Sequence, residues 1–181
     1  GEEAFRIDTH SAAVRSVHYS PLGNRLLTAS NDGTVRLFNS SNGSLVRTIE
    51  SGPVPATYAE SDANADRVLV ASADGMARIW RESGDPVVLE GHDGPLWNAA
   101  FSPDGEMVVT SADDLSARLW DARNGAMLAK IQDLGAFGAN WAVFSPDGQM
   151  VAAAMKGVHL QLWKLTFETE FVPEESAEPS P

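Results

Sequence analysis

Short apolar runs alternate with clusters of turn-forming residues along most of the chain. The first stretch shows the full pattern, with runs at Val14–Tyr19, Arg25–Ala29, Thr34–Phe38 and Leu45–Ile49. Such runs are too short for helices, and they are rich in residues that suit a pleated surface. The pattern therefore predicts four strands in this stretch.

Proline and glycine mark the link between the first two runs in three stretches, at Pro21–Asn24, Pro103–Gly105 and Pro146–Gly148. Proline presets a negative φ and glycine accepts a positive φ, so these links favour tight hairpins. The second stretch carries the looser polar segment Asp62–Asp66 instead. Each stretch is predicted to fold as an antiparallel meander of four strands.

One aromatic position recurs at the end of each third run, at spacings of 42, 40 and 43 residues. It is occupied by Phe38, Trp80, Trp120 and Trp163. Repetition at a fixed period of about 40 residues indicates four copies of one structural unit. The copies lie near residues 10–50, 52–90, 92–133 and 135–165.

A single meander cannot bury both of its faces, and repeats solve this by stacking on their neighbours. Stacking four-stranded sheets around an axis gives a β-propeller. Short, regular strands also suit a β-sandwich, but the regular period of the repeat argues against that fold.

The third copy opens with Gly91-His92 and ends its third run with Trp120-Asp121. These features resemble the WD40 repeat, and the resemblance covers residues 4–165. It implies an all-β fold of four four-stranded antiparallel blades of a WD40 β-propeller. Since most WD40 rings have seven blades and some have eight, it also implies about half of a usual ring, completed by oligomerisation or by another segment.

In the family that the chain resembles, four positions form a buried hydrogen-bonded set. In the third copy they are His92, Thr110, Asp114 and Trp120. The tryptophan donates to the hydroxyl, the hydroxyl meets the histidine, and the aspartate orients the ring. This is chemically coherent, because a buried indole needs an acceptor and a neutral imidazole can both donate and accept.

The other copies keep this set to different degrees when positions 28, 10 and 6 residues before the aromatic site are compared. The first copy keeps His10, Thr28 and Asp32, with Phe38 in place of the indole. The second keeps only Asp74 and Trp80, and the fourth only Trp163. We expect the second and fourth blades to depend more on apolar packing and to be less regular.

A threonine, a histidine and an aspartate together also invite comparison with a hydrolase triad. A nucleophile needs an exposed oxygen and an oxyanion hole. Thr110 lies inside the apolar run Met107–Thr110, and Trp120 would occupy its hydroxyl. We therefore expect a structural set and no enzyme. No spacing typical of metal or phosphate-loop sites is present in the sequence, so no metal and no cofactor are predicted.

The net charge of −12 disfavours binding to the phosphate backbone of nucleic acids. There is no cysteine, and no run approaches the roughly 20 apolar residues of a membrane span. The start at Gly1 suggests a trimmed chain or a piece of a longer polypeptide. We expect a cytoplasmic location, with the nucleus as the alternative.

The resemblance places a protein or peptide partner on the narrow face around the propeller channel. By equivalence between copies, the candidate contact residues are Arg15, Asn31, Thr57, Trp97, Asp113, Asn140 and Lys156. Trp97 has two interpretations, a surface anchor or a residue packed between blades. Trp141, one residue further along its strand, is predicted to be core.

Four blades leave two apolar end faces, which invite association. Residues 4–8 precede His10 as an outer strand of a preceding blade would, whereas the last copy lacks a good outer strand. Residues 166–181 offer only a partial strand, with Thr166–Phe171 as a local alternative, and an acidic Pro/Ser-rich tail predicted to be disordered.

These features predict a non-catalytic protein-interaction scaffold that binds through the narrow face or a blade edge. The alternative is a structural, self-assembly module. We favour head-to-tail pairing of two chains into an eight-bladed ring. Completion by another chain or by the rest of the polypeptide, and closure as four blades, stay open.

Overall fold

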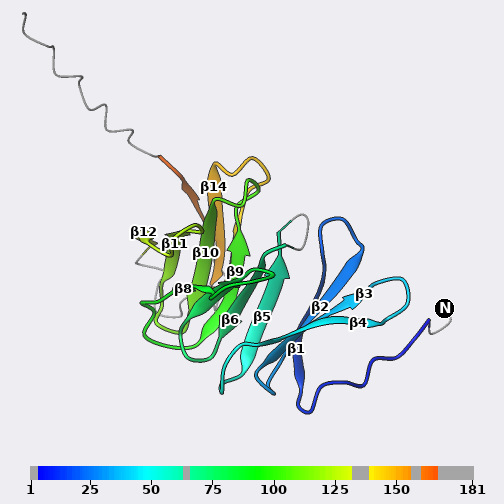
Figure 1. Cartoon of the computed structure of the whole chain (residues 1–181). Coiled ribbons are helices and arrows are strands. Elements are labelled where there is room, and N and C mark those ends of the chain that lie inside the picture. Colours follow the sequence, from blue (N-terminus) through cyan, green and yellow to red (C-terminus); the bar gives the residue numbers. More distant parts are fainter. Residues whose placement is uncertain (1–3, 63–65, 132–138, 156–159, 167–181) are drawn as a thin grey trace, which may run out of the picture.

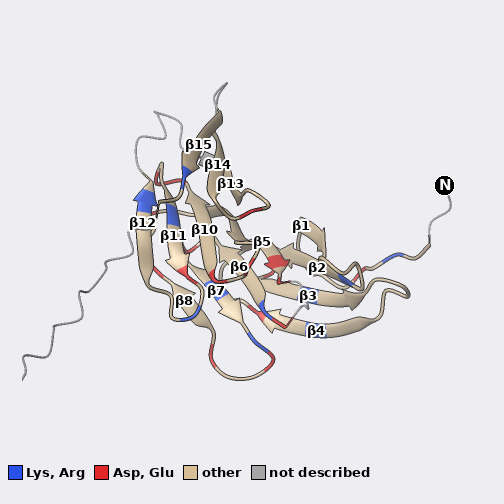
Figure 2. Ribbon diagram, turned by 90° about the horizontal axis from the view of Figure 1, so that it is seen from above, with Lys and Arg blue, Asp and Glu red and all other residues tan. Residues whose placement is uncertain are grey.

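The computed structural model describes residues 4–62, 66–131, 139–155 and 160–166. It is built from antiparallel sheets that radiate from a common axis like a fan (Figures 1 and 2). The first strands of the four sheets, β1, β5, β9 and β13, lie side by side in chain order.

Each sheet is a meander in which consecutive strands pair. The first contains β1 (Val14–Tyr19), β2 (Arg25–Ser30), β3 (Thr34–Asn39) and β4 (Leu45–Glu50). The second contains β5 (Ala56–Ser61), β6 (Val68–Ser72), β7 (Ala77–Trp80) and β8 (Val87–Leu89). The third contains β9 (Leu96–Phe101), β10 (Met107–Ala112), β11 (Ala117–Asp121) and β12 (Met127–Ile131). The fourth contains β13 (Ala139–Phe144), β14 (Met150–Met155) and β15 (Leu160–Lys164).

The predicted all-β fold of four blades is confirmed, with one difference in strand number. The fourth sheet has three strands within the described residues, and its predicted outer strand falls in residues 167–181, outside them. Residues 4–8, predicted as an outer strand, form no strand in the single chain. The Phe5 ring lies against Gly43 instead.

Three apolar cores lie between successive sheets. Leu27, Val35 and Leu37 of the first sheet pack against Val68 and Val70 of the second. The second and third sheets share another cluster, and so do the third and fourth. Each sheet is thus stabilised by packing against the next, as expected when no single sheet can bury both of its faces.

The two end sheets leave core-type residues exposed. In the fourth sheet Leu160 and Leu162 are 63% and 56% exposed. Their equivalents Ala117 and Leu119 in the third sheet are 0% and 3% exposed, because the fourth sheet covers them. In the first sheet Val17 is 58% exposed, although its equivalents Ala59, Ala99 and Ala142 are all buried at 0%.

Candidate functional site

The four-residue polar set of the third sheet is assembled in the structure. Trp120 Nε1 donates to Thr110 Oγ1 at 2.8 Å, and that hydroxyl lies 2.7 Å from His92 Nε2. His92 Nδ1 lies 2.9 Å from Asp114 Oδ2. A carboxylate only accepts, so Nδ1 carries the proton and Nε2 accepts from the threonine. Burial lowers the pKa of His92, against the raising influence of Asp114, which favours this neutral ring.

Two further residues, which the sequence prediction missed, complete the surroundings of Asp114. Ser116 Oγ donates to Asp114 Oδ1 at 2.7 Å, and Arg118 Nη2 lies 3.2 Å from Oδ2. Burial alone would raise the pKa of Asp114, but hydrogen bonds from Ser116, the Asp93 backbone and His92 lower it to about 2. The aspartate is therefore ionised at neutral pH.

The first sheet repeats this arrangement without the indole. His10 Nδ1 lies 3.0 Å from Asp32 Oδ2, and Nε2 lies 2.7 Å from Thr28 Oγ1. Thr34 Oγ1 donates to Asp32 Oδ1 at 2.7 Å, as Ser116 does in the third sheet. The hydroxyl stands four residues before the aromatic position in both copies, a spacing that could have revealed it.

The second sheet does not bring its two remaining members together. Asp74 Oδ2 accepts from Arg78 Nη2 at 2.7 Å. The Trp80 indole nitrogen is buried and has no hydrogen-bond partner within the described part of the chain. Trp80 instead packs against the core between the first and second sheets. Trp80 therefore contributes apolar packing, and the expectation that it belongs to a hydrogen-bonded set is wrong for the described residues.

The polar set is structural in its chemistry. Thr110 is fully buried, and its hydroxyl both accepts from Trp120 and donates to His92. Such an oxygen cannot reach a substrate, which a nucleophile must do. In the described ranges no group of three or more His, Cys, Asp or Glu side chains is arranged to hold a metal ion.

A cavity of about 290 Å³ lies where the inner strands of all four sheets converge. Most of its lining is aromatic or basic. The lining residues are Arg15, Ser16, His18, Thr57, Tyr58, Trp97 and Trp141. The Tyr58 ring meets His18 and Trp141 edge-on, with centroids 4.6 and 5.1 Å away. We call this space the axial cavity.

The axial cavity contains three of the seven predicted contact residues, Arg15, Thr57 and Trp97. Trp97 Nε1 donates to Asp113 Oδ1 at 3.1 Å. Asp113, a fourth predicted contact residue, therefore lies beside the axial cavity. Asn31 is exposed in the β2–β3 turn, and the buried Asn140 Oδ1 has no hydrogen-bond partner among described residues. Lys156 lies outside the described residues.

The prediction that Trp141 belongs to the core is wrong. Its side chain is 42% exposed and lines the axial cavity. It occupies the position of Ser16, Tyr58 and Asn98, whose side chains bond to or pack against the next sheet. The fourth sheet ends the fan, so a residue at this position stays open to solvent.

Polar side chains also join one inner strand to the next. Backbone N–H groups of inner strands donate to Ser16 Oγ, Glu60 Oε1 and Asn98 Oδ1 of the preceding sheet. The donors belong to Ala59, Phe101 and Ala142. The sequence prediction missed these links, because each uses a different residue type.

Comparison with known proteins agrees with this geometry. Residues 1–39 and 86–121 match the family model described as WD domain, G-beta repeat. The chain therefore carries repeats of the WD40 type. The matched stretches contain most of the two copies whose polar sets are assembled, which are the copies closest to the family pattern.

Several curated WD40-type relatives align with large parts of the chain. Striatin-4 of Mus musculus is 30% identical over 141 residues, covering 65% of this chain and 19% of the relative. The B-type cell cycle switch protein ccs52B of Medicago truncatula is 26% identical over 126 residues, covering 66% and 26%. A shorter match, 33% over 58 residues, joins the chain to eukaryotic translation initiation factor 3 subunit I of Candida glabrata, covering 32% and 16%. The chain thus spans about a quarter or less of these relatives.

A solved structure shares the fold. The computationally designed Ika4 protein superposes with a TM-score of 0.76 at 22% identity, covering 92% of this chain and 99% of that one. At this identity the likeness speaks for the fold alone. Within the described residues no helix is long and apolar enough to cross a membrane.

Proposed function

We propose that this WD40 chain is a non-catalytic protein-interaction scaffold, with the axial cavity as its contact surface. The observation that carries the proposal is convergence: side chains from four successive sheets line one space that includes two partly exposed tryptophans. Tryptophan and arginine dominate the energetics of protein interfaces. The partner is a protein or peptide that inserts an apolar side chain beside Trp97 and Trp141.

Several further observations support a protein partner over other classes. The net charge of −12 repels nucleic acid. One relative is a subunit of eukaryotic translation initiation factor 3, and thus part of an assembly. The threonine that resembles a nucleophile is enclosed by Trp120 and His92. We place such a scaffold in the cytoplasm or the nucleus.

A capture experiment with matched variants tests the proposal. The intact chain, W97A, W141A and R15E are immobilised at equal density and exposed to the same lysate, and bound proteins are compared by mass spectrometry. We expect bound proteins to be lost from all three variants and retained by R123A, which alters a 67% exposed arginine in the β11–β12 turn. Retention of the same proteins by all three cavity variants, with unchanged circular dichroism, contradicts the proposal.

The exposed end faces favour a second role, self-assembly. Leu160 and Leu162 at one end, and Val14 and Val17 at the other, occupy positions that are buried between sheets elsewhere in the chain. A second copy offers the matching face at each end, so two chains placed head to tail cover both. Residues 4–8 of one copy would then lie beside β15 of the other.

Solution mass tests self-assembly directly. We expect sedimentation at micromolar concentration to give twice the 19.3 kDa chain mass. Replacing both leucines, L160E together with L162E, should return the single-chain mass. The control L22E changes a 66% exposed leucine in the β1–β2 turn and should leave the mass unchanged. A wild-type chain that sediments at 19.3 kDa rules out self-pairing.

A further inference from the structure

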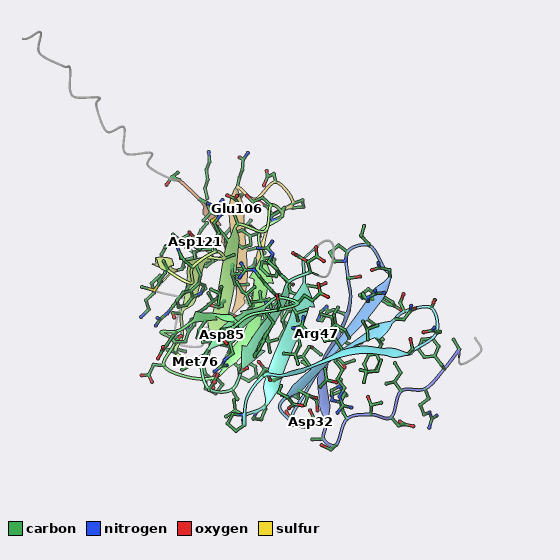
Figure 3. The ribbon with its side chains drawn as sticks, in the orientation of Figure 1. Asp32, Arg47, Met76, Asp85, Glu106 and Asp121 are labelled. Carbon is green, nitrogen blue, oxygen red and sulfur yellow. The ribbon has the colours of Figure 1, made fainter. Side chains whose placement is uncertain are left out.

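A second and larger cavity, of about 520 Å³, lies where the turns between the first two strands of successive sheets come together. Its walls include Pro21, Glu60, Asp62, Arg67, Phe101 and Asp104. These turns lie at the opposite ends of the inner strands from Arg15 and Trp97. Figure 3 shows the two ends, with Glu106 of the β9–β10 turn at one and Asp32 of the β2–β3 turn at the other. We call this space the turn-side cavity.

The hydrogen bonds that Glu60 makes to its neighbours do not require a negative charge. Oε1 accepts from the Phe101 backbone N–H at 2.6 Å, and Oε2 accepts from the Tyr58 hydroxyl at 3.3 Å. Both donors are neutral. Ser16 and Asn98 make the same kind of link between sheets with uncharged side chains. The negative charge of Glu60 is therefore surplus to the link that it makes.

The cations near Glu60 are committed elsewhere. Arg67 Nε donates to Asp62 Oδ2 at 2.8 Å, and Nη1 donates to the Gly105 carbonyl at 2.8 Å. The same guanidinium lies over the Phe101 ring, 4.9 Å from its centroid. Within the part of the chain that the structure describes, no Lys or Arg nitrogen pairs with Glu60.

The cavity as a whole carries excess negative charge. Asp62 balances Arg67, which leaves Glu60 and Asp104 without a cation in the lining. A hydrogen bond from Ser102 Oγ lowers the pKa of Asp104, so this carboxylate is charged at neutral pH. Phe101 and Pro21 supply apolar walls. Long basic side chains suit such a site, because they combine an apolar stem with a charged end.

We propose that the turn-side cavity binds a basic side chain of a protein partner, whose ammonium or guanidinium group pairs with the Glu60 carboxylate. This site is separate from the axial cavity and does not depend on the function proposed for it. A buried carboxylate that gains a cation makes a stronger pair than an exposed one, because less water screens it. The chain's overall negative charge also speeds the approach of basic partners.

The test uses three tripeptides, acetyl-Gly-Lys-Gly-amide, its arginine analogue and its neutral citrulline analogue. Each is titrated into the ¹⁵N-labelled intact chain while amide chemical shifts are followed. We expect saturable shifts at the Phe101 and Gly105 amides with the lysine or the arginine peptide, and none with citrulline. The dissociation constants of the lysine and arginine peptides should rise about tenfold or more in E60Q, which keeps an acceptor for the Phe101 amide.

Matched variants separate this site from others. E50Q makes the same charge change on the exposed face of β4 and should bind like wild type. W97A should also bind like wild type, even if it loses the partner of the axial cavity. Equal binding by E60Q and wild type, equal binding of citrulline, or no shift at Phe101 each overturns the proposal. Burial raises the pKa of Glu60 to about 7, so binding of the basic peptides to wild type should strengthen between pH 6 and pH 8. If E60Q fails to fold, wild-type binding that does not strengthen over this range overturns the proposal as well.

Discussion

The indole nitrogen of Trp120 donates to Thr110 Oγ1 at 2.8 Å in the fully buried centre of the third sheet. The first sheet has Phe38 at this position, so Thr28 is hydrogen-bonded to His10 without an indole donor. The threonine at this position therefore bonds two polar side chains in the third sheet and one in the first.

Replacing the threonine should reveal this difference. Thr110→Val leaves both the Trp120 N–H and His92 Nε2 without a partner, and we expect it to lower the free energy of unfolding by roughly 2–4 kcal/mol. Thr28→Val removes the partner of His10 Nε2 and a long 3.5 Å bond to the Arg36 carbonyl, with no indole involved, and should cost about 1–2 kcal/mol. Urea unfolding followed by circular dichroism measures both. Equal losses would show that the indole bond contributes nothing.

Much of this architecture follows from the sequence because it repeats. The recurring aromatic position fixed the four sheets, and its spacing to His92, Thr110 and Asp114 located the polar set. The links between inner strands escaped prediction, because Ser16, Glu60 and Asn98 share no residue type. Trp141 was misplaced for another reason. Its exposure depends on whether a further sheet follows, which local pattern does not report.

The position of a leucine in the fan should decide its contribution to stability. Leu119→Ala removes a side chain that is 3% exposed and packed between the third and fourth sheets. We expect a loss of about 2–5 kcal/mol from transfer and cavity terms. Leu162→Ala, at the equivalent but 56% exposed position, should cost less than about 1 kcal/mol at nanomolar concentration.

The comparison of these two leucines also reports on association. If a second copy covers the end sheet, the cost of Leu162→Ala should grow as protein concentration rises, because binding stabilises the folded state. Thermal unfolding at several concentrations measures this dependence. A large loss for Leu162→Ala at every concentration would mean that the end sheet is covered from within the chain.

Two turn glycines should respond differently to a methyl group. Gly23 and Gly33 both have positive φ, of 71° and 80°, which costs a non-glycine residue about 1 kcal/mol. A Cβ at Gly23 meets nothing within 4 Å, whereas a Cβ at Gly33 would lie 2.5 Å from the Gly52 carbonyl oxygen. Gly33→Ala should therefore destabilise the chain by roughly 1–3 kcal/mol more than Gly23→Ala. Thermal melts of the two variants side by side measure the difference.

Glu60 should make stability fall as pH rises toward neutrality. Burial raises its pKa to about 7 from an ordinary value of 4.5, against hydrogen bonds from the Phe101 backbone and Tyr58 that lower it. Between these two values the folded chain binds more protons than the unfolded chain at this site. The stabilisation is complete below about pH 4.5 and is lost as pH rises through 7.

Glu60→Gln removes this titration and should flatten the difference between pH 4.5 and pH 7.5. Urea unfolding across that range, on wild type and E60Q together, isolates Glu60, because His18, His92 and the aspartates contribute equally to both proteins. E50Q, with the same loss of charge at an exposed site, should follow the wild-type curve. A basic side chain seated against Glu60 stabilises its ionised form. Lysine peptide should therefore raise the stability of the wild-type chain near pH 7, and raise that of E60Q less at the same peptide concentration. Parallel curves for wild type and E60Q at every pH would show that the carboxylate titrates as it does in the unfolded chain.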